Sequence, residues 1–548
     1  MSALAPGAAA GTAPVRPRAS GLTGTATLVR LAVRRHRLLV PVSVLALVGV
    51  VAGSARATFA LYPDASQAVG AFRSTLDNPA IVAVYGPVSS LTLDTLATFK
   101  TVLLGAAFLC LLAAVLVRRH TRAEEEEGRL ELLGSGVVGR RAPLTAAVLV
   151  ATTTVLATAA LTTVGAVAVG LDRAGSVALG VAWAAAGLTW VGVAAVSAQL
   201  TETARGATGF ALGSLAAAYL VRALGDTAPD GPLRALTWLS PLGWAEKVGA
   251  YGDNRVAVGL LGLLAYAALL LVAYALLDRR DLGAGVLPSR PGAATGSVDG
   301  VGRLTRRLAR STVVGWTLAF VVVGAVVGSL AGSVESFLDS PATARLLRTM
   351  GGDRGSIIDT FYATELHTLA VAAAALGVTL VTRMRSEETS GRLELLLAGR
   401  VTRVGWARAH LADALAATSL VVSVAALVAG LLDGRRTGDT AGSVGRLLVA
   451  GLATLPAVWV CVAVAVLLVG AAPRRTGLAW AALVAFLVLG EFGPLLGLPG
   501  WLSGLSPFGH LPDLPGGQAT AAPLLALTVV AAALVAVGLT GLRRRDLG

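Results

Sequence analysis

The chain has 548 residues, of which 55% are hydrophobic and 14% charged, and its mean hydropathy is +0.75. Soluble domains are about a quarter charged, so this composition excludes an ordinary soluble protein and predicts an all-α integral membrane protein. The formal net charge of +14 suits basic membrane flanks beside anionic lipid headgroups, and nucleic-acid binding is not expected.

Apolar runs long enough to cross a bilayer occur six times in each half of the chain. The predicted spans are 38–58, 96–117, 143–170, 176–200, 206–222 and 256–277, then 311–331, 363–382, 409–431, 446–470, 477–497 and 521–541. An even number per half gives both halves the same orientation. The sequence therefore predicts about 12 transmembrane helices arranged as two parallel six-helix repeats.

The predicted organisation has four parts. Residues 1–20 are small and Pro-containing and are expected to be disordered, 21–283 form the first six-helix half, 284–302 a cytoplasmic linker and 303–548 the second six-helix half. Most Lys and Arg fall in the termini and in the loops on their side of the membrane. By the positive-inside tendency both termini are cytoplasmic, in a multi-pass protein of the cell membrane.

Basic segments precede the first span of each half, at 21–37 and 304–310. Their composition fits amphipathic helices lying in the interface, and it fits simple positive-inside flanks equally well. The outer segments around Trp238 and Trp501 are rich in Pro, Gly and Trp. They are expected to be short interfacial or re-entrant pieces, or else ordinary turns in an aromatic belt.

A charged motif after the second span occurs twice. Residues 122–133 read RAEEEEGRLELL and residues 385–396 read RSEETSGRLELL, identical at nine of twelve positions and 263 residues apart. Two further landmarks recur in the same order: Trp238 returns as Trp501, and the RRDLG run at 279–283 returns at 544–548. A shared charged pattern does not arise from apolar composition alone, so the chain is an internal duplication.

Each motif is expected to extend its span as a helix into the cytoplasm. Glu125 with Arg129, and Glu388 with Arg392, are then i, i+4 ion pairs on the helix surface. The leucines that follow each pair would form an exposed cluster suited to docking a partner, although a solvated charged face is the alternative. Charge reversal at both Glu125 and Glu388 is expected to leave the protein folded and inserted in the membrane, but to break its functional link to that partner.

The motif and its place between the second and third of six spans resemble the coupling-helix loop of ABC-2 type transporter permeases. Two fused halves resemble the actinobacterial exporter permeases of the tetronasin type. The resemblance implies two copies of a cytoplasmic ABC ATPase as partners, besides membrane lipid and a small amphipathic substrate. The residues that it assigns to ATPase coupling are Arg122, Glu124, Glu125, Glu127, Arg129, Leu130, Glu131 and Leu133, with Arg385, Glu387, Glu388, Arg392, Leu393, Glu394 and Leu396.

The chain lacks a Walker A motif. That motif needs a Lys before Ser or Thr in a Gly-rich loop, and the two lysines, Lys100 and Lys247, stand in other contexts. We expect no catalytic residues and no cofactor in this chain, with ATP and Mg²⁺ bound by the partner subunit. The five histidines are scattered without metal-ligand spacing, so no metal site is predicted.

The predicted function is the permease of an ATP-driven exporter for a hydrophobic or amphipathic compound. A proton-coupled carrier of the major facilitator type, which also has twelve spans in two parallel halves, stays as the alternative. Its proton carriers would be sought among the acids within or near spans, which are Glu202, Glu365, Asp413 and Glu491.

Overall fold

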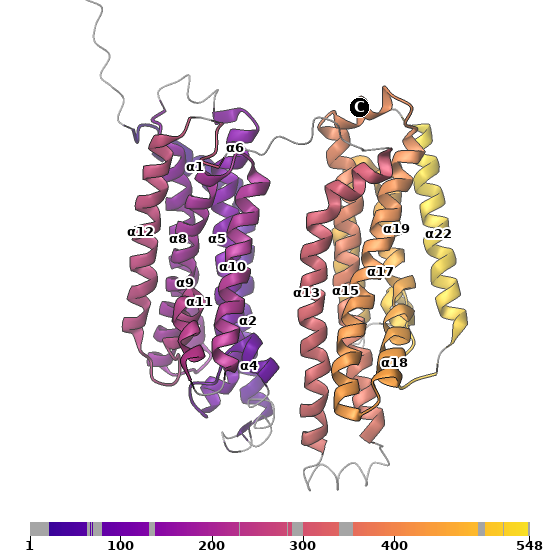
Figure 1. The fold of residues 1–548 in the computed structure, drawn as a ribbon, viewed down its shortest axis with the longest axis horizontal. Helices are drawn as coiled ribbons and strands as arrows, with labels where there is room; N and C mark the ends of the chain where they lie inside the picture. Colours follow the sequence, from indigo (N-terminus) through magenta and orange to yellow (C-terminus); the bar gives the residue numbers. More distant parts are fainter. Residues whose placement is uncertain are drawn as a thin grey trace, which may run out of the picture. The chain divides into compact units, whose positions relative to one another are not determined.

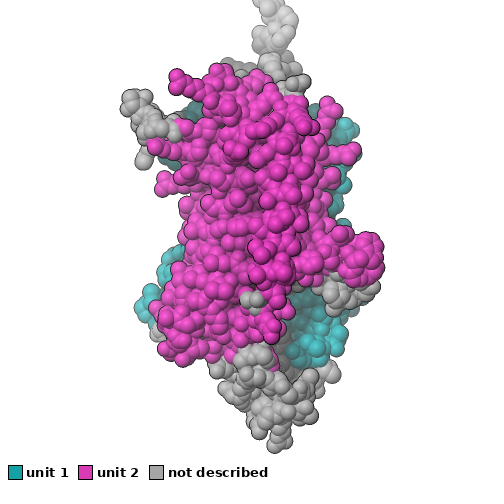
Figure 2. All heavy atoms as spheres, turned by 90° about the vertical axis from the view of Figure 1, so that its right-hand side faces the viewer, with its two compact units in different colours: residues 1–291 teal, residues 292–548 magenta. Residues whose placement is uncertain are grey.

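The computed structural model describes residues 21–62, 66, 68–69, 79–130, 138–228, 231–281, 283–287, 300–338, 354–491, 499–518 and 520–545. Within these ranges every regular element is a helix, as an all-α protein requires. The chain divides into two compact units, Met1–Pro291 and Gly292–Gly548, which Figure 2 colours separately. The expected disordered segment 1–20 lies outside the described residues.

Unit 1 is a bundle of long helices with short helices at both ends (Figure 1). Its elements are α1 (Thr25–Arg35), α2 (Leu39–Leu61), α4 (Pro79–Tyr85), α5 (Leu93–His120), α6 (Arg122–Glu126), α8 (Ala142–Ala168), α9 (Arg173–Leu200), α10 (Ala204–Thr227), η1 (Pro232–Leu239), α11 (Pro241–Lys247), η2 (Val256–Val258) and α12 (Gly259–Arg279). Within this unit α1 and α6 lie at one end of the long helices and α4 lies at the other.

The core of unit 1 is built around α9, which packs against α5, α8 and α12. Two of its tryptophans are fully buried, and their indole N–H groups donate to backbone carbonyls: Trp183 to Val102 at 2.9 Å and Trp190 to Ala211 at 3.2 Å. The Trp183 ring fits because a Cβ on Gly105 would lie 1.9 Å from it. Small residues that admit large neighbours are typical of helix packing in membranes, where shape complementarity replaces the hydrophobic effect.

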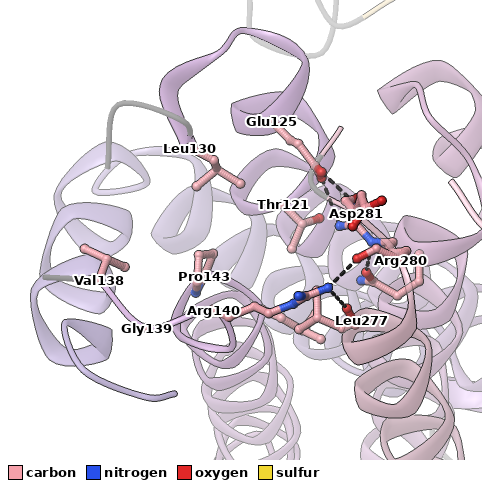
Figure 3. A pocket seen from close by; sticks show the side chains of 12 residues that line it. Thr121, Glu125, Leu130, Val138, Gly139, Arg140, Pro143, Leu277, Arg280 and Asp281 are labelled. Atoms are coloured by element: carbon pink, nitrogen blue, oxygen red, sulfur yellow. Dashed lines mark hydrogen bonds and ion pairs between the residues drawn. The ribbon is translucent and has the colours of Figure 1, made fainter. Parts of the chain in front are cut away.

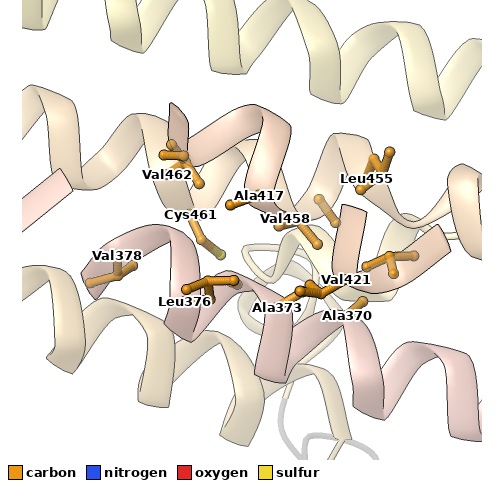
Figure 4. Packing of buried hydrophobic residues seen from close by; sticks show 14 of the residues in the cluster. Ala370, Ala373, Leu376, Val378, Ala417, Val421, Leu455, Val458, Cys461 and Val462 are labelled. Atoms are coloured by element: carbon orange, nitrogen blue, oxygen red, sulfur yellow. The ribbon is translucent and has the colours of Figure 1, made fainter. Parts of the chain in front are cut away.

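Unit 2 has the elements α13 (Val301–Leu338), α15 (Arg354–Thr389), α16 (Arg392–Leu397), α17 (Arg403–Thr437), α18 (Thr440–Ala453), α19 (Leu455–Ala471), η3 (Pro473–Arg475), α20 (Leu478–Glu491), α21 (Gly500–Ser503), η4 (Pro507–His510) and α22 (Ala521–Arg544). Its core lies between α15, α17 and α19. Figure 4 shows Ala373 and Leu376 of α15 facing Val421 of α17 and Val458 and Cys461 of α19. The unit therefore has its own buried apolar centre.

The two units differ at the start of their first spans. In unit 1 the basic segment forms α1, separated by a turn from α2, because Pro41 has no N–H and is tolerated in the first turn of a helix but not inside one. In unit 2 the segment 304–310 belongs to α13, a single helix of 38 residues. Of the two alternatives for this segment, a separate amphipathic helix is therefore wrong for unit 2, and a basic flank of the span fits.

Eleven of the described helices are long and apolar enough to cross a membrane. They match eleven of the predicted spans, and the tenth is broken between α18 and α19, with Pro456 in the first turn of α19. The helix in the place of the eleventh prediction, α20, has 14 residues, and 492–498 lie outside the described residues. This is a multi-pass helical membrane protein.

Candidate functional site: two buried carboxylate clamps

We call the two charged motifs, 122–133 and 385–396, the acidic loops. In unit 1 the second glutamate of the loop, Glu125, is buried. Glu125 lies on α6, where it is 9% exposed, and Arg280, just beyond α12, binds it with both terminal nitrogens at 2.7 and 3.0 Å. Arg122 approaches the same carboxylate at 3.1 Å, and the backbone N–H of Gly283 donates to it at 2.6 Å. We call Glu125, Arg122 and Arg280 the Glu125 clamp. It joins the loop after the second span to the end of the sixth.

Each arginine of the clamp also donates hydrogen bonds to residues outside the clamp. The Nε of Arg122, a side chain with no exposed surface, donates to the carbonyl of Ala198 at 2.5 Å, and its Nη2 donates to that of Ala284 at 2.7 Å. The Nε of Arg280 donates to the side chain of Gln199 at 2.7 Å. Charged groups removed from water are stable only when paired and hydrogen-bonded in this way. The clamp thereby ties α6, α9 and α12 together.

The acidic loop of unit 2 repeats the arrangement. Arg545, just beyond α22, binds Glu388 with both terminal nitrogens at 2.7 and 2.9 Å, and Arg385 approaches the same carboxylate at 3.0 Å. We call Glu388, Arg385 and Arg545 the Glu388 clamp. The backbone of Arg545 is also hydrogen-bonded, because Arg403 donates to its carbonyl at 2.8 Å. In unit 1 Arg140 makes the matching bond to the carbonyl of Arg280.

The expected surface pairs Glu125 with Arg129 and Glu388 with Arg392 are wrong. A glycine in the left-handed region stands between the members of each pair, Gly128 at φ 72° and Gly391 at φ 71°, so neither pair lies on one continuous helix. Arg129 instead binds Glu124 at 3.0 Å and contacts Glu127. The Nε of Arg392 donates to Ser390 at 2.8 Å.

The glutamate before each clamp has different partners in the two units. Glu124 binds Arg35 of α1 at 2.5 Å as well as Arg129. Its counterpart Glu387 is 7% exposed and accepts from the indole N–H of Trp406 at 3.1 Å, with Nε2 of His410 3.2 Å away. The first loop is therefore linked to the short helix α1, whereas the second is anchored in the bundle.

The leucines after the motif divide between buried and exposed positions. Leu393 is 2% exposed, whereas Leu395 on the same short helix α16 is 79% exposed. Leu396 is half-buried, and Leu130 of unit 1 is half-buried as well. Glu131 and Leu133 lie outside the described residues. A uniformly exposed leucine cluster is therefore wrong for unit 2, because Leu393 belongs to the core.

The polar surface of the loops consists of side chains outside the clamps. In unit 1 Glu127 and Arg129 keep 52% and 46% of their side-chain surface exposed. In unit 2 Arg392 and Glu394 are exposed on α16. These residues are open to a partner, whereas Arg122, Glu125 and Glu388 are committed to contacts within their own unit. Charge reversal at Glu125 would face two buried arginines, so the expectation that it leaves the protein folded does not fit this geometry.

A cavity of about 160 Å³ lies beside the Glu125 clamp. Figure 3 shows Leu130, Pro143 and Arg140 around it, with Glu125 and Arg280 joined at its edge. Its lining is partly apolar and partly ionic. Among the residues that the structure describes, no three His, Cys, Asp or Glu side chains stand close enough to hold a metal ion.

A second ionic cluster in unit 1 was not predicted. Arg222 near the end of α10 has no exposed surface and binds Asp226 at 2.9 Å, with Glu246 of α11 at 3.7 Å. Burial and the neighbouring Asp226 carboxylate raise the pKa of Glu246 to about 8. The start of α10 lies at the acidic loop, since Glu126 accepts from the N–H of Ala204 at 2.9 Å. Arg222 is therefore about 27 Å further along α10, at the opposite end of the unit.

Unit 2 has a comparable cluster near the end of α17. Asp433 has no exposed surface and accepts from Arg436 at 2.7 Å, from Ser443 at 2.8 Å and from Arg446 at 3.1 Å. Arg446 also binds Asp359 of α15 at 2.7 Å. These pairs were not predicted from the sequence, although the i, i+4 spacing of Arg222 and Asp226 and the i, i+3 spacing of Asp433 and Arg436 were the signal available.

The acids considered as proton carriers stand on separate elements. Asp413 of α17 is paired with Arg306 of α13 at 3.5 Å. Glu365 lies half-buried on α15, and Glu202 stands in the turn between α9 and α10. Nothing is described of the side chain of Glu491. Proton carriers need connected sites within the membrane, and these residues belong to separate elements.

The fold and the duplicated loops define a helical membrane permease with two related halves in one chain. Comparison with known proteins agrees. The chain is 40% identical over 534 residues, covering 96% of both chains, to the multidrug efflux system permease protein Rv1217c of Mycobacterium tuberculosis (strain ATCC 25618 / H37Rv). Residues 300–543 match the family model described as multidrug efflux system permease Rv1217c, C-terminal domain. The chain belongs to this family of efflux system permeases.

Family membership decides between the predicted classes of protein. A permease relative that covers both halves makes this chain a transport subunit rather than an enzyme. It confirms the prediction of an exporter permease and gives no support to the major facilitator alternative.

Proposed function

We propose that this chain is the membrane subunit of an ATP-driven ABC exporter that moves hydrophobic or amphipathic, drug-like compounds out of the cytoplasm. The observation that carries the proposal is the pair of clamps. In both units the loop that resembles a coupling helix is bonded to the end of the unit's last long helix through a buried Glu–Arg pair. A displacement of the loop is thereby passed to α12 or α22.

ATP and Mg²⁺ would be bound by two copies of a separate cytoplasmic ABC ATPase, one beneath each half. Closure of the two ATPase subunits on ATP would push the loops and switch the central path between inward and outward access. ATP can drive that switch because it binds one state more tightly than the other. The clamps would act as the stiff links between the pushed loops and the helices that move.

The exposed loop residues would form the ATPase contact. In unit 1 these are Glu127 and Arg129, with Leu130 beside them. In unit 2 they are Arg392, Glu394, Leu395 and Leu396. Arg122, Glu125, Arg385 and Glu388 would transmit force without touching the partner. Glu124 and Glu387 have different partners, so the two contacts need not be equivalent.

The membrane arrangement belongs to the same proposal. The chain would have twelve spans in two parallel repeats, with both termini and both acidic loops in the cytoplasm, and α20 would be the eleventh of these spans. The 14 residues of α20 cover about 21 Å, which is less than the roughly 30 Å thickness of the hydrocarbon core of a bilayer. The likeness to tetronasin-type exporters stays a prediction. The hydrophobic or amphipathic nature of the substrate is a prediction as well.

The test is uptake of a lipophilic dye into inverted vesicles that contain this chain and its cognate ABC ATPase, with ATP and a protonophore present. Uptake that needs ATP hydrolysis and survives the protonophore is the expected result. Uptake that is abolished by the protonophore and driven by a pH gradient without ATP would contradict the proposal. Vesicles without the ATPase subunit are the control and should show no ATP-dependent uptake.

A further inference from the structure

A groove of about 820 Å³ runs along the surface of unit 2 between α13 and α17. Basic side chains of α13, Arg306, Arg307 and Arg310, line one end. The apolar side chains Val313 and Val314 of α13 and Leu420 of α17 continue the lining. Arg310 and the pair Val313 and Val314 are one helical turn apart on α13. A molecule bound along the groove would therefore contact basic side chains at one end and apolar side chains next to them.

Beyond the apolar end of the groove, α13 and α17 touch closely. A Cβ on Gly324 would lie 2.5 Å from the carbonyl oxygen of Ala425, and one on Gly328 would lie 2.7 Å from that of Ala429. Two glycines four residues apart bring the two backbones together here, and the groove lies on the side of this contact nearer the start of α13.

The charge of the groove is only partly compensated. Arg306 is paired with Asp413 at 3.5 Å. Within the described part of the chain Arg307 and Arg310 have no hydrogen bond or ion pair, and both are exposed. A groove with three arginines and one aspartate attracts an anion, and its apolar continuation favours an anion that carries hydrocarbon.

The basic end of the groove lies at the same end of unit 2 as the Glu388 clamp. The Nη1 of Arg383 donates to the carbonyl of Leu308 at 2.8 Å, and its Nε lies 3.3 Å from Glu387, the residue before the clamp glutamate. In the proposed orientation this end faces the cytoplasm. The arginines then stand at headgroup level and Val313, Val314 and Leu420 at the level of the acyl chains.

We propose that this groove binds one anionic phospholipid of the cytoplasmic leaflet. Its phosphate is held by Arg307 and Arg310, and its acyl chains lie along Val313, Val314 and Leu420. In the described part of unit 1 the basic residues before the first span stand instead on the separate helix α1, which packs against α8. The site is therefore a feature of the second half.

The experiment is native mass spectrometry of the full-length chain released from detergent micelles, with phosphatidylglycerol or phosphatidylcholine titrated in the absence and in the presence of inorganic phosphate. The test variant is Arg307→Gln with Arg310→Gln, which keeps the Arg306–Asp413 pair. The control is Arg30→Gln with Arg34→Gln, which removes two exposed arginines of α1. A third variant, Val314→Trp, fills the groove without changing its charge.

We expect the parent chain to bind phosphatidylglycerol more tightly than phosphatidylcholine. At about 1 kcal/mol for each arginine near a lipid surface, the test variant should lose roughly 30-fold in phosphatidylglycerol affinity, and the control should stay near the parent. Val314→Trp should weaken both lipids. Melting temperatures measured without added lipid show that each variant is folded.

Three results would overturn the proposal. Equal losses in the test and control variants would mean diffuse attraction to basic flanks. Equal affinities for the two lipids would mean an apolar groove without headgroup recognition. Full competition by inorganic phosphate would mean a free anion site. No ATPase is needed, so failure here leaves the proposed exporter function untouched.

Discussion

Arg280 places both terminal guanidinium nitrogens on the carboxylate of Glu125, which stands 155 residues earlier in the chain. Arg545 holds Glu388 in the same way. A bidentate Arg–carboxylate pair fixes orientation as well as distance. Each acidic loop and the end of the last long helix of its unit are therefore one mechanical element.

Removal of the clamp carboxylate should strongly destabilise the protein. Glu125→Ala leaves Arg122, which has no exposed surface, and Arg280 without their partner, and breaking a buried pair from one side costs about 3–5 kcal/mol. Unfolding by denaturant in mixed micelles measures the change. Glu127→Ala, at an exposed glutamate of the same loop, is the control and should stay within about 0.5 kcal/mol of the parent. A small change at Glu125 would mean that the clamp is not formed.

Both halves of each clamp were visible in the sequence, yet their pairing was not. The acidic motif and the RRDLG run were recognised as repeated landmarks, and Glu125 and Arg280 belong to them. The helical rule of i, i+4 pairing assigned Glu125 to Arg129, because local rules carry no information about contacts between residues far apart in the chain. Two charged landmarks that recur together in both halves were the signal available.

Truncation of the exposed leucine of α16 should impair coupling without affecting the fold. Leu395 is 79% exposed, so Leu395→Ala should leave the melting temperature near that of the parent while lowering dye-stimulated ATP hydrolysis by the reconstituted complex. Leu287→Ala is the matched control, since Leu287 is also an exposed leucine, 48% accessible, and lies outside the loops. If both variants stimulate the ATPase alike, Leu395 does not contact the partner.

Two glycines of α13 should respond in opposite ways to a methyl group. Gly324→Ala would force a Cβ to within 2.5 Å of the carbonyl oxygen of Ala425, and overpacking costs about 1–3 kcal/mol. Gly315→Ala meets open space and should be neutral or stabilising by up to about 1 kcal/mol, from helix propensity. Thermal unfolding of both variants in detergent checks the contrast. Equal effects would contradict the close packing of α13 on α17.

The stability of unit 1 should depend on pH through Glu246. Its ordinary pKa is 4.5, and burial raises the folded pKa to about 8, so the unfolded chain ionises first as pH rises. The folded state therefore loses stability between about pH 4.5 and pH 8, by at most about 1.4 kcal/mol per pH unit. Melting temperatures across that range should fall less steeply for Glu246→Gln than for the parent. Glu394→Gln, at an exposed glutamate, should keep the parent's slope. Identical slopes in all three proteins would contradict a raised pKa of Glu246 in the folded state.

The long helices were well predicted from the sequence, and the exceptions have local causes. Eleven predicted spans coincide with long apolar helices because runs of Ala, Val and Leu are a strong signal for a membrane helix. The break before α19 follows from Pro456, which was present in the predicted span. The continuity of α13 was missed because a basic flank and the first turns of a span have the same composition, and the absence of proline from Val301–Leu338 was the distinguishing feature.

The most direct test of the clamps as links is the number of dye molecules exported per ATP hydrolysed by the reconstituted complex with Arg545→Gln. This change removes the bidentate contact while leaving Glu388 paired with Arg385. Arg544→Gln, at the exposed neighbouring arginine, is the control. We expect Arg545→Gln to retain ATPase binding and basal hydrolysis but to export fewer dye molecules per ATP, while the control matches the parent. An unchanged ratio in Arg545→Gln, with the protein folded and hydrolysing ATP, would contradict the transmission of ATPase closure through the Glu388 clamp.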